Sequence, residues 1–213
     1  MFDFYDIFLL TSLGVFFILF GGRSLSIKLK KKINPIKIHF KKNGKKRTLE
    51  IAVFLIVNLF VIEAVLYSIS SGFRIFPYTL NLRIFEYTAF KIAGIVFIII
   101  GFIFFGKALS DLGYSWRLGI DDKNPGNLIT RGIYSLSRNP IYIFFNLYFF
   151  GVFMVTSNMI FLIFFIIQFI LLHLEIMEEE KFLIEKFGVY YTDYCKKTGR
   201  YITFLKRNND FFK

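Results

Sequence analysis

The feature that most constrains this chain is a series of apolar segments that approach or exceed the length needed to cross a membrane. A helix needs about 20 mostly apolar residues to cross ~30 Å of hydrocarbon. With 55% of its 213 residues hydrophobic, the chain carries more apolar side chain than a soluble domain of this size can bury. Because the backbone polar groups of a lipid-embedded segment must be satisfied internally, we predict an all-α integral membrane protein with about five transmembrane helices. The expected spans are Tyr5–Phe20, Leu49–Ser70, Ile84–Phe105, Ile141–Thr156 and Met159–Leu174.

The basic residues lie in the loops beside these spans and predict the orientation of the chain. The segment from Arg23 to Arg47 holds eleven Lys and Arg and no acidic residue, and such loops stay in the cytoplasm. Asp3 and Asp6 precede the first span, which is opposite to the charge order of a signal peptide. We therefore expect the N-terminus outside and the C-terminus in the cytoplasm. Since membrane orientation accounts for the net charge of +12, we expect no nucleic-acid partner.

Two charged residues fall inside the predicted spans. Glu63 and Lys91 would lie at a similar depth, each about two helical turns from the outer end of its helix. An isolated charge inside a membrane is unfavourable, so we expect these two side chains to form an ion pair. The alternative is that Lys91 extends alone to the interface.

Several kinds of site are not predicted. A single cysteine, Cys195, excludes an internal disulfide framework. His39 and His173 are isolated from each other and from any metal-binding spacing, so we expect no metal. The sequence contains neither G-x-G-x-x-G nor a P-loop, the fingerprints of soluble nucleotide-binding folds.

The first stretch that can carry chemistry runs from Leu128 to Tyr142, where a polar loop meets the fourth span. Pro140 suits the first position of a helix, and the free backbone amides at a helix start favour an anionic group. Arg138, just before it, can make a bidentate contact with a carboxylate or a phosphate. The alternative interpretation is that Arg138 and Tyr142 only anchor the span at the interface.

The second stretch lies on the helix that follows the fifth span. Glu175, Glu178 and Glu179 are spaced i, i+3 and i+4, so they share one helix face. Three carboxylates on one face repel one another and require a cation or solvent nearby. The spacing leaves two interpretations open: a solvated acidic face, or a site for a group that is cationic or rich in hydroxyls.

Together these two stretches resemble the membrane methyltransferases of the isoprenylcysteine carboxyl methyltransferase and phospholipid methyltransferase superfamily. The shared pattern is L-(V/I)-x-x-G-x-Y-x-x-x-R-(H/N)-P-x-Y, a helical hairpin, and then E-E-x-x-L-x-x-x-F-G-x-x-Y-x-x-Y. The resemblance covers about residues 93–202 and divides the chain into N-terminal membrane helices, 1–92, and a methyltransferase-like region, 93–213. The matching residues are Leu128, Ile129, Gly132, Tyr134, Arg138, Asn139, Pro140, Tyr142, Glu179, Glu180, Leu183, Phe187, Gly188, Tyr191 and Tyr194.

The resemblance implies an S-adenosylmethionine-dependent methyltransferase whose cytosolic C-terminal helical segment forms the cofactor pocket at the membrane edge. A lipophilic or prenylated acceptor would enter between helices, from among the membrane lipids. Glu175 and Arg200 are the residues expected to act on the acceptor. The residues expected to bind the cofactor are Gly126, Asn127, Leu128, Ile129, Tyr134, Arg138, Asn139, Pro140, Ile141, Tyr142 and Glu179.

This chain departs from the family pattern at positions that bear on the acceptor. Glu175 stands where the prenylcysteine enzymes often have an arginine, and a glutamate there repels a carboxylate and suits an amine. Asn139 replaces the commoner histidine, and Gly199 and Thr203 stand where prolines are usual. A prenylcysteine-type carboxylate and a lipid amine both remain open, as does a small thiol. The alternatives of another class are a sterol-reductase-like enzyme that uses NADPH and a non-catalytic membrane scaffold.

Overall fold

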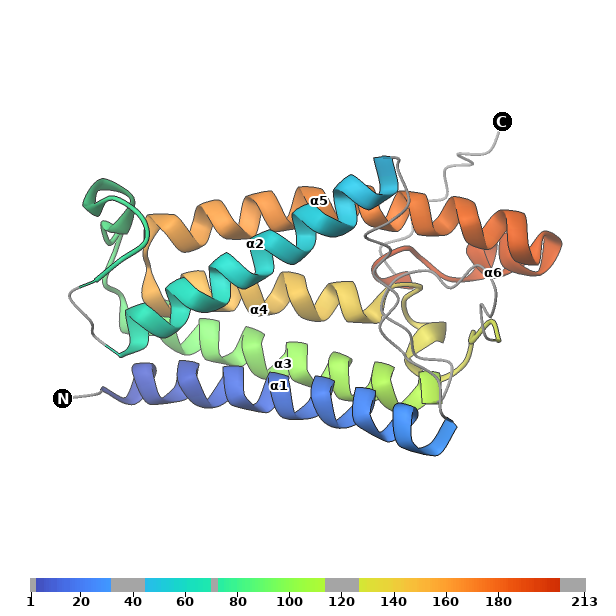
Figure 1. The fold of residues 1–213 in the computed structure, drawn as a ribbon, viewed down its shortest axis with the longest axis horizontal. Coiled ribbons are helices and arrows are strands. Elements are labelled where there is room, and N and C mark those ends of the chain that lie inside the picture. The colour runs from blue at the N-terminus through green and yellow to red at the C-terminus, as the bar shows by residue number, and fades with distance from the viewer. Residues whose placement is uncertain (1–2, 32–44, 70–72, 114–126, 204–213) are drawn as a thin grey trace.

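The computed structural model describes residues 3–31, 45–69, 73–113 and 127–203, and this part of the chain is helical (Figure 1). Within these ranges no β-strand occurs, and one isolated bridge joins Arg83 to Asn158. The long helices lie roughly along one axis, so the bundle has two ends. The elements are α1 Phe4–Lys31, α2 Lys45–Ser68, η1 Tyr78–Asn81, α3 Thr88–Leu112, η3 Gly132–Ser135, α4 Pro140–Thr156, α5 Met159–Phe187 and α6 Val189–Lys197.

Four helices, α1, α2, α3 and α5, are long and apolar enough to cross a membrane, and α4 is a shorter apolar helix of 17 residues. The prediction of an all-α integral membrane protein is therefore confirmed. The helix ends differ from the predicted spans, because polar residues continue several helices past the apolar stretch. The first helix reaches Lys31 rather than Phe20, and α5 continues to Phe187.

The short helix α4 is the centre of the bundle. It packs along both α3 and α5, and aromatic rings fill the contacts around it. Phe149 on α4 stacks on Phe60 of α2 with ring centroids 3.8 Å apart, and Phe144 stacks on Phe105 of α3 at 4.5 Å. Because α4 begins directly after the Arg138-Asn139-Pro140 segment, this packing fixes where that segment lies.

A pair of glycines brings α3 and α4 into close contact. A Cβ at Gly94 would lie 2.6 Å from the carbonyl oxygen of Gly151, and a Cβ at Gly151 would lie 2.7 Å from that of Gly94. Neither contact is tolerable, so each position requires a residue without a side chain. Small residues at a helix contact are a common means of close packing in membranes, where lipid supplies little hydrophobic driving force between helices.

The predicted ion pair between Glu63 and Lys91 is wrong. Glu63 is fully buried and accepts a hydrogen bond from the backbone N–H of Ile75, at 3.2 Å. Lys91 instead lies over the ring of Tyr5, with its Nζ atom 4.6 Å from the ring centroid. The connection after α2 folds back over Glu63, and the start of α1 covers Lys91. Each of the two charged side chains therefore contacts a residue of these segments instead of contacting the other charged side chain. Sequence spacing along two helices does not contain this information.

Candidate active site

The segment before α4 is held in place by the C-terminal part of the chain. The backbone N–H of Arg138 donates to the carbonyl of Gly199 at 3.0 Å, and the N–H of Thr203 donates to the carbonyl of Leu136 at 2.9 Å. The Thr203 hydroxyl also donates to the Leu136 carbonyl, at 2.6 Å. Two segments some 60 residues apart in sequence are thus bonded together along their backbones.

Thr203 and Gly199 therefore have definite roles, although they replace the prolines expected there. Thr203 ties the tail to the segment through its hydroxyl and its N–H. At Gly199 a Cβ would lie 2.7 Å from the carbonyl oxygen of Ile202, so a side chain would displace the tail. The observed course of the tail depends on these two residues.

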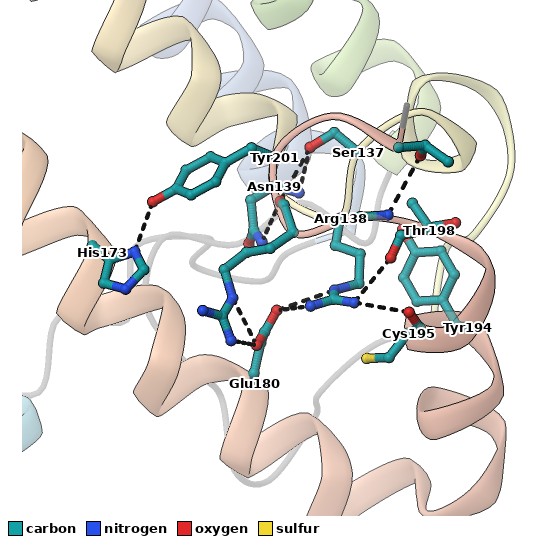
Figure 2. Close-up of polar contacts among 12 residues, drawn as sticks. Ser137, Arg138, Asn139, His173, Glu180, Tyr194, Cys195, Thr198 and Tyr201 are labelled. Carbon is teal, nitrogen blue, oxygen red and sulfur yellow. Dashed lines mark hydrogen bonds and ion pairs between the residues drawn. The ribbon is translucent and has the colours of Figure 1, made fainter. Parts of the chain in front are cut away.

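A buried carboxylate joins the same two segments to α5, and Figure 2 shows its contacts. Glu180, which is only 7% exposed, accepts from Nη2 and Nε of Arg138 at 2.6 and 3.1 Å through one oxygen. Its other oxygen accepts from Nη2 and Nε of Arg200, also at 2.6 and 3.1 Å. We call Glu180, Arg138 and Arg200 the Glu180 cluster. The hydrogen bonds to Glu180 raise the pKa of the Arg200 guanidinium above its usual value, so Arg200 remains charged.

Arg138 and Arg200 differ in what they leave accessible. Arg138 also donates through Nη1 to the carbonyls of Cys195 and Thr198, at 3.2 and 2.9 Å. Its side chain is 10% exposed, whereas that of Arg200 is 34% exposed. Arg138 thus fastens the start of α4 to the end of α6, and Arg200 retains a surface that a small molecule can reach. Two roles remain predictions: the binding of the cofactor by Arg138, and the action of Arg200 on the acceptor.

Asn139 and Pro140 set the first turn of α4. The Asn139 side chain donates to the carbonyl of Arg200 at 3.0 Å, and its backbone N–H donates to the hydroxyl of Ser137, also at 3.0 Å. Pro140 occupies the first helical position, as the sequence predicts, and is buried. The amide of Asn139 is therefore engaged with the protein, and the half-buried Ile141 and Tyr142 follow it on the helix.

The glycine of the motif permits a tight turn beside α3. Gly132 has a positive φ of 64°, and a side chain there would collide with the carboxylate of Asp111. That carboxylate accepts a hydrogen bond from the N–H of Ile133 at 2.7 Å. The turn places Tyr134 in the interior, where its carbonyl accepts from the hydroxyl of Tyr194. Burial, with the nearby charges of Glu179 and Asp111, raises the pKa of the Tyr134 hydroxyl, so it stays protonated.

The acidic residues form the opposite side of the site. The carboxylates of Glu179, Glu175 and Glu50 lie near enough to the Tyr142 hydroxyl for their charges to affect it, and the effect of Glu179 is the largest of the three. Glu179 acts on Tyr134 as well. The two stretches that the sequence singled out are therefore brought together, as the bonds between Arg138 and Glu180 also show. We call Tyr142, Glu50, Glu175 and Glu179 the acidic cluster.

Glu50 is the residue that the sequence analysis missed. It lies on α2, is 9% exposed, and comes from the half of the chain that carries no motif. A signal was present, because Glu50 is the second residue of the predicted span Leu49–Ser70 and a carboxylate at the edge of a membrane span is unfavourable without a purpose. Its position beside Tyr142 depends on how α2 packs on α5, which spacing does not reveal.

The remaining predicted residues precede η3 in the chain. Asn127 is exposed, and Leu128 and Ile129 are half-buried as the chain leads into η3. Gly126 lies outside the described residues. Among the residues that the structure describes, no group of three or more His, Cys, Asp or Glu side chains is arranged to hold a metal ion.

Comparison with known proteins points to one superfamily. A model of the phospholipid methyltransferase family matches residues 90–190, from the start of α3 to the start of α6. The protein-S-isoprenylcysteine O-methyltransferase of Saccharomyces cerevisiae is 30% identical over 182 residues, which is 82% of this chain and 72% of the yeast protein. The region matched by the family model contains Arg138, Glu179 and Glu180 but not Glu50 or Arg200.

We expect the substitution Glu180→Gln to destabilise the fold strongly. It leaves two arginines without their carboxylate at a buried position, which typically costs about 3 kcal/mol or more. Glu185→Gln is the matched control, since Glu185 is exposed on the same helix. Thermal unfolding in detergent measures the difference. Equal unfolding temperatures for the two variants would contradict a structural role for the Glu180 cluster.

Proposed function

Because the chain belongs to the superfamily of isoprenylcysteine carboxyl and phospholipid methyltransferases, and is an integral membrane methyltransferase, we propose that S-adenosylmethionine is its methyl donor and that the acceptor is a lipid amine. The observation that carries this proposal is the position of Glu179 near Tyr134 and Tyr142, whose hydroxyls its charge affects. That position joins the two halves of the motif at one place, between η3, the first turn of α4 and α5.

The residues of this place fit the donor molecule. The carboxylate of Glu179 suits ribose hydroxyls or an ammonium group, both of which donate hydrogen bonds. The first turn of α4, after Pro140, offers backbone amides to a carboxylate. Asn127, Leu128 and Ile129 supply a part-apolar edge beside it. These residues, with Tyr134, Asn139, Ile141 and Tyr142, form the proposed binding set.

The chain contributes mainly by positioning. S-adenosylmethionine, when bound, supplies a methyl group on a positively charged sulfur. Transfer then requires the acceptor atom, the methyl carbon and the sulfur to lie in line, and alignment alone can account for a large part of an acceleration. The Glu180 cluster and the bonds from Asn139 to the tail hold the first turn of α4 still while this alignment is made.

The acidic cluster favours an amine acceptor over a carboxylate. The Tyr142 hydroxyl is affected by the charges of three carboxylates, those of Glu50, Glu175 and Glu179. Three carboxylates near one place attract a cation and repel an anion. An alkylammonium group is attracted there and can pass a proton to one of the carboxylates. The carboxylate would hold that proton, and the neutral amine would keep the free electron pair that it needs to accept a methyl group from the donor.

A second acceptor is a prenylcysteine-type carboxylate, because the yeast relative is named for isoprenylcysteine O-methylation. In this chain the residue suited to hold such a carboxylate is Arg200, whose side chain is 34% exposed. Its engagement with Glu180 reduces the charge available for that purpose. For this reason the prenylcysteine-type carboxylate is the second candidate acceptor, and the lipid amine is the first.

The orientation of the site follows from the loop charges. The segment from Arg23 to Arg47 is strongly basic, and such segments remain in the cytoplasm. α1 ends and α2 begins within this segment, at the end of the bundle where α6 lies (Figure 1). We therefore propose a cytoplasmic site and C-terminus and an N-terminus on the other side. Residues 93–213 would form the catalytic region, with Glu50 added from the N-terminal helices.

We expect S-adenosylmethionine to bind the detergent-purified protein and Glu179→Gln to weaken that binding about tenfold or more, since a charge-assisted hydrogen bond is lost. Calorimetric titration measures the dissociation constant. Glu178→Gln is the matched control, because Glu178 is paired with Lys181 at 2.9 Å on the surface of the same helix. An unchanged affinity in Glu179→Gln, with the protein folded, would contradict the proposed cofactor site.

We expect Glu50→Gln to change the choice of acceptor rather than the binding of the donor. The KM for a long-chain primary amine should rise about tenfold, because one carboxylate of the acidic cluster is removed. The affinity for S-adenosylmethionine should remain as in the wild type. Methylation assays with the amine and with a prenylcysteine analogue separate the two acceptors. Methylation of the analogue alone by the wild type would overturn the amine in favour of the carboxylate.

A further inference from the structure

A cavity of about 200 Å³ lies at the end of the bundle opposite to the Glu180 cluster. Its walls come from the first turn of α1, the end of α2, the connection that follows α2 and the first turn of α3, which Figure 1 shows gathered at the end where the N-terminus lies. Since one water takes ~30 Å³ of liquid volume, the cavity has room for a small polar group of several atoms.

One wall of the cavity is acidic. Asp3 and Asp6 both line it, and reciprocal hydrogen bonds hold them together at the start of α1. The N–H of Asp6 donates to Oδ1 of Asp3 at 2.8 Å, and the N–H of Asp3 donates to Oδ2 of Asp6 at 3.3 Å. Each of these bonds uses one oxygen of a carboxylate, so the pair retains capacity to bind a cation.

The lining of the cavity also contains three basic residues, Arg74, Arg83 and Lys91. Arg83 is paired with Glu86 at 2.8 Å. Lys91 lies over the Tyr5 ring, and no carboxylate of the described residues lies within ion-pair distance of its ammonium group. A half-buried ammonium in the first turn of a membrane helix is unfavourable without an anion. The cavity beside it is where that anion can bind.

The surroundings of the cavity are apolar. Phe4 and Ile7 on α1 and Ile92 and Val96 on α3 are exposed large hydrophobic residues near this end of their helices. The ends of membrane-spanning helices lie at the depth of the lipid headgroups. A ligand whose charged group enters the cavity can therefore lay apolar chains along these two helices, which a free phosphate ion cannot do.

We propose that this cavity binds the zwitterionic headgroup of a phospholipid, with the phosphate against Lys91 and the ammonium against Asp3 and Asp6. The headgroup bridges the first turns of α1 and α3 and so fastens α1 to the bundle. This lipid is distinct from any methyl acceptor, because the cavity lies at the other end of the molecule from the acidic cluster. The proposal is independent of the proposed function.

Thermal unfolding of the full-length protein in detergent tests the proposal with phosphatidylcholine as the probe. Phosphatidylcholine is zwitterionic, and its nitrogen already carries three methyl groups, so it cannot serve as an amine acceptor. A diacylglycerol with the same chains lacks the headgroup, phosphocholine lacks the chains, and inorganic phosphate lacks both. The variant Lys91→Met removes the charge, and Lys107→Met, exposed near the other end of the same helix, is its matched control.

Phosphatidylcholine should raise the unfolding temperature of the wild type and of Lys107→Met in a saturable manner, and diacylglycerol should not. The dissociation constant should rise about tenfold in Lys91→Met, the loss of one charge-assisted contact, and should also rise in Asp6→Asn. Phosphocholine should compete with the lipid. Equal stabilisation by diacylglycerol, or equal lipid affinity in Lys91→Met and Lys107→Met, would overturn the proposal. Stabilisation by inorganic phosphate with no further effect of lipid would overturn it in favour of a free anion.

Discussion

One buried carboxylate, Glu180, holds together the three pieces from which the candidate site is made. Through its two oxygens it binds Arg138, just before α4, and Arg200, in the tail, while it belongs to α5 itself. Removing a partner from a buried ion pair leaves an uncompensated charge and is strongly unfavourable. The position of the first turn of α4, the course of the tail and the end of α6 all depend on this arrangement.

The adjacent glutamates Glu179 and Glu180 differ in role: Glu180 stabilises the fold, and Glu179 is proposed to bind the ligand. Successive residues on an α-helix point about 100° apart, so the two carboxylates face different surroundings. Glu180 binds two arginines in the interior, whereas the charge of Glu179 affects the hydroxyls of Tyr134 and Tyr142. One glutamate of the motif thus stabilises the wall of the candidate site, and the other is the carboxylate that we propose to bind the ligand.

Much of the fold could be predicted from sequence because span length and apolar composition are local properties. The pairing of the two motif stretches was likewise predictable, and the relatives decide for a methyltransferase over a reductase or a scaffold. The side-chain partners were not predictable. Glu63 and Lys91 each meet residues from a connection or a helix end, and Glu50 reaches Tyr142 only because α2 packs on α5. These contacts join elements that are far apart in the chain, so the spacing of residues in the sequence cannot predict them.

The measurement that tests this account most directly is an experimental structure of the protein with S-adenosylhomocysteine, the demethylated form of the proposed donor, bound. The account predicts the ligand between η3, the first turn of α4 and Glu179, with Arg138 and Arg200 still bound to the two oxygens of Glu180. A structure in which Arg138 leaves Glu180 to bind the carboxylate of the ligand, or in which the ligand lies elsewhere, would contradict it.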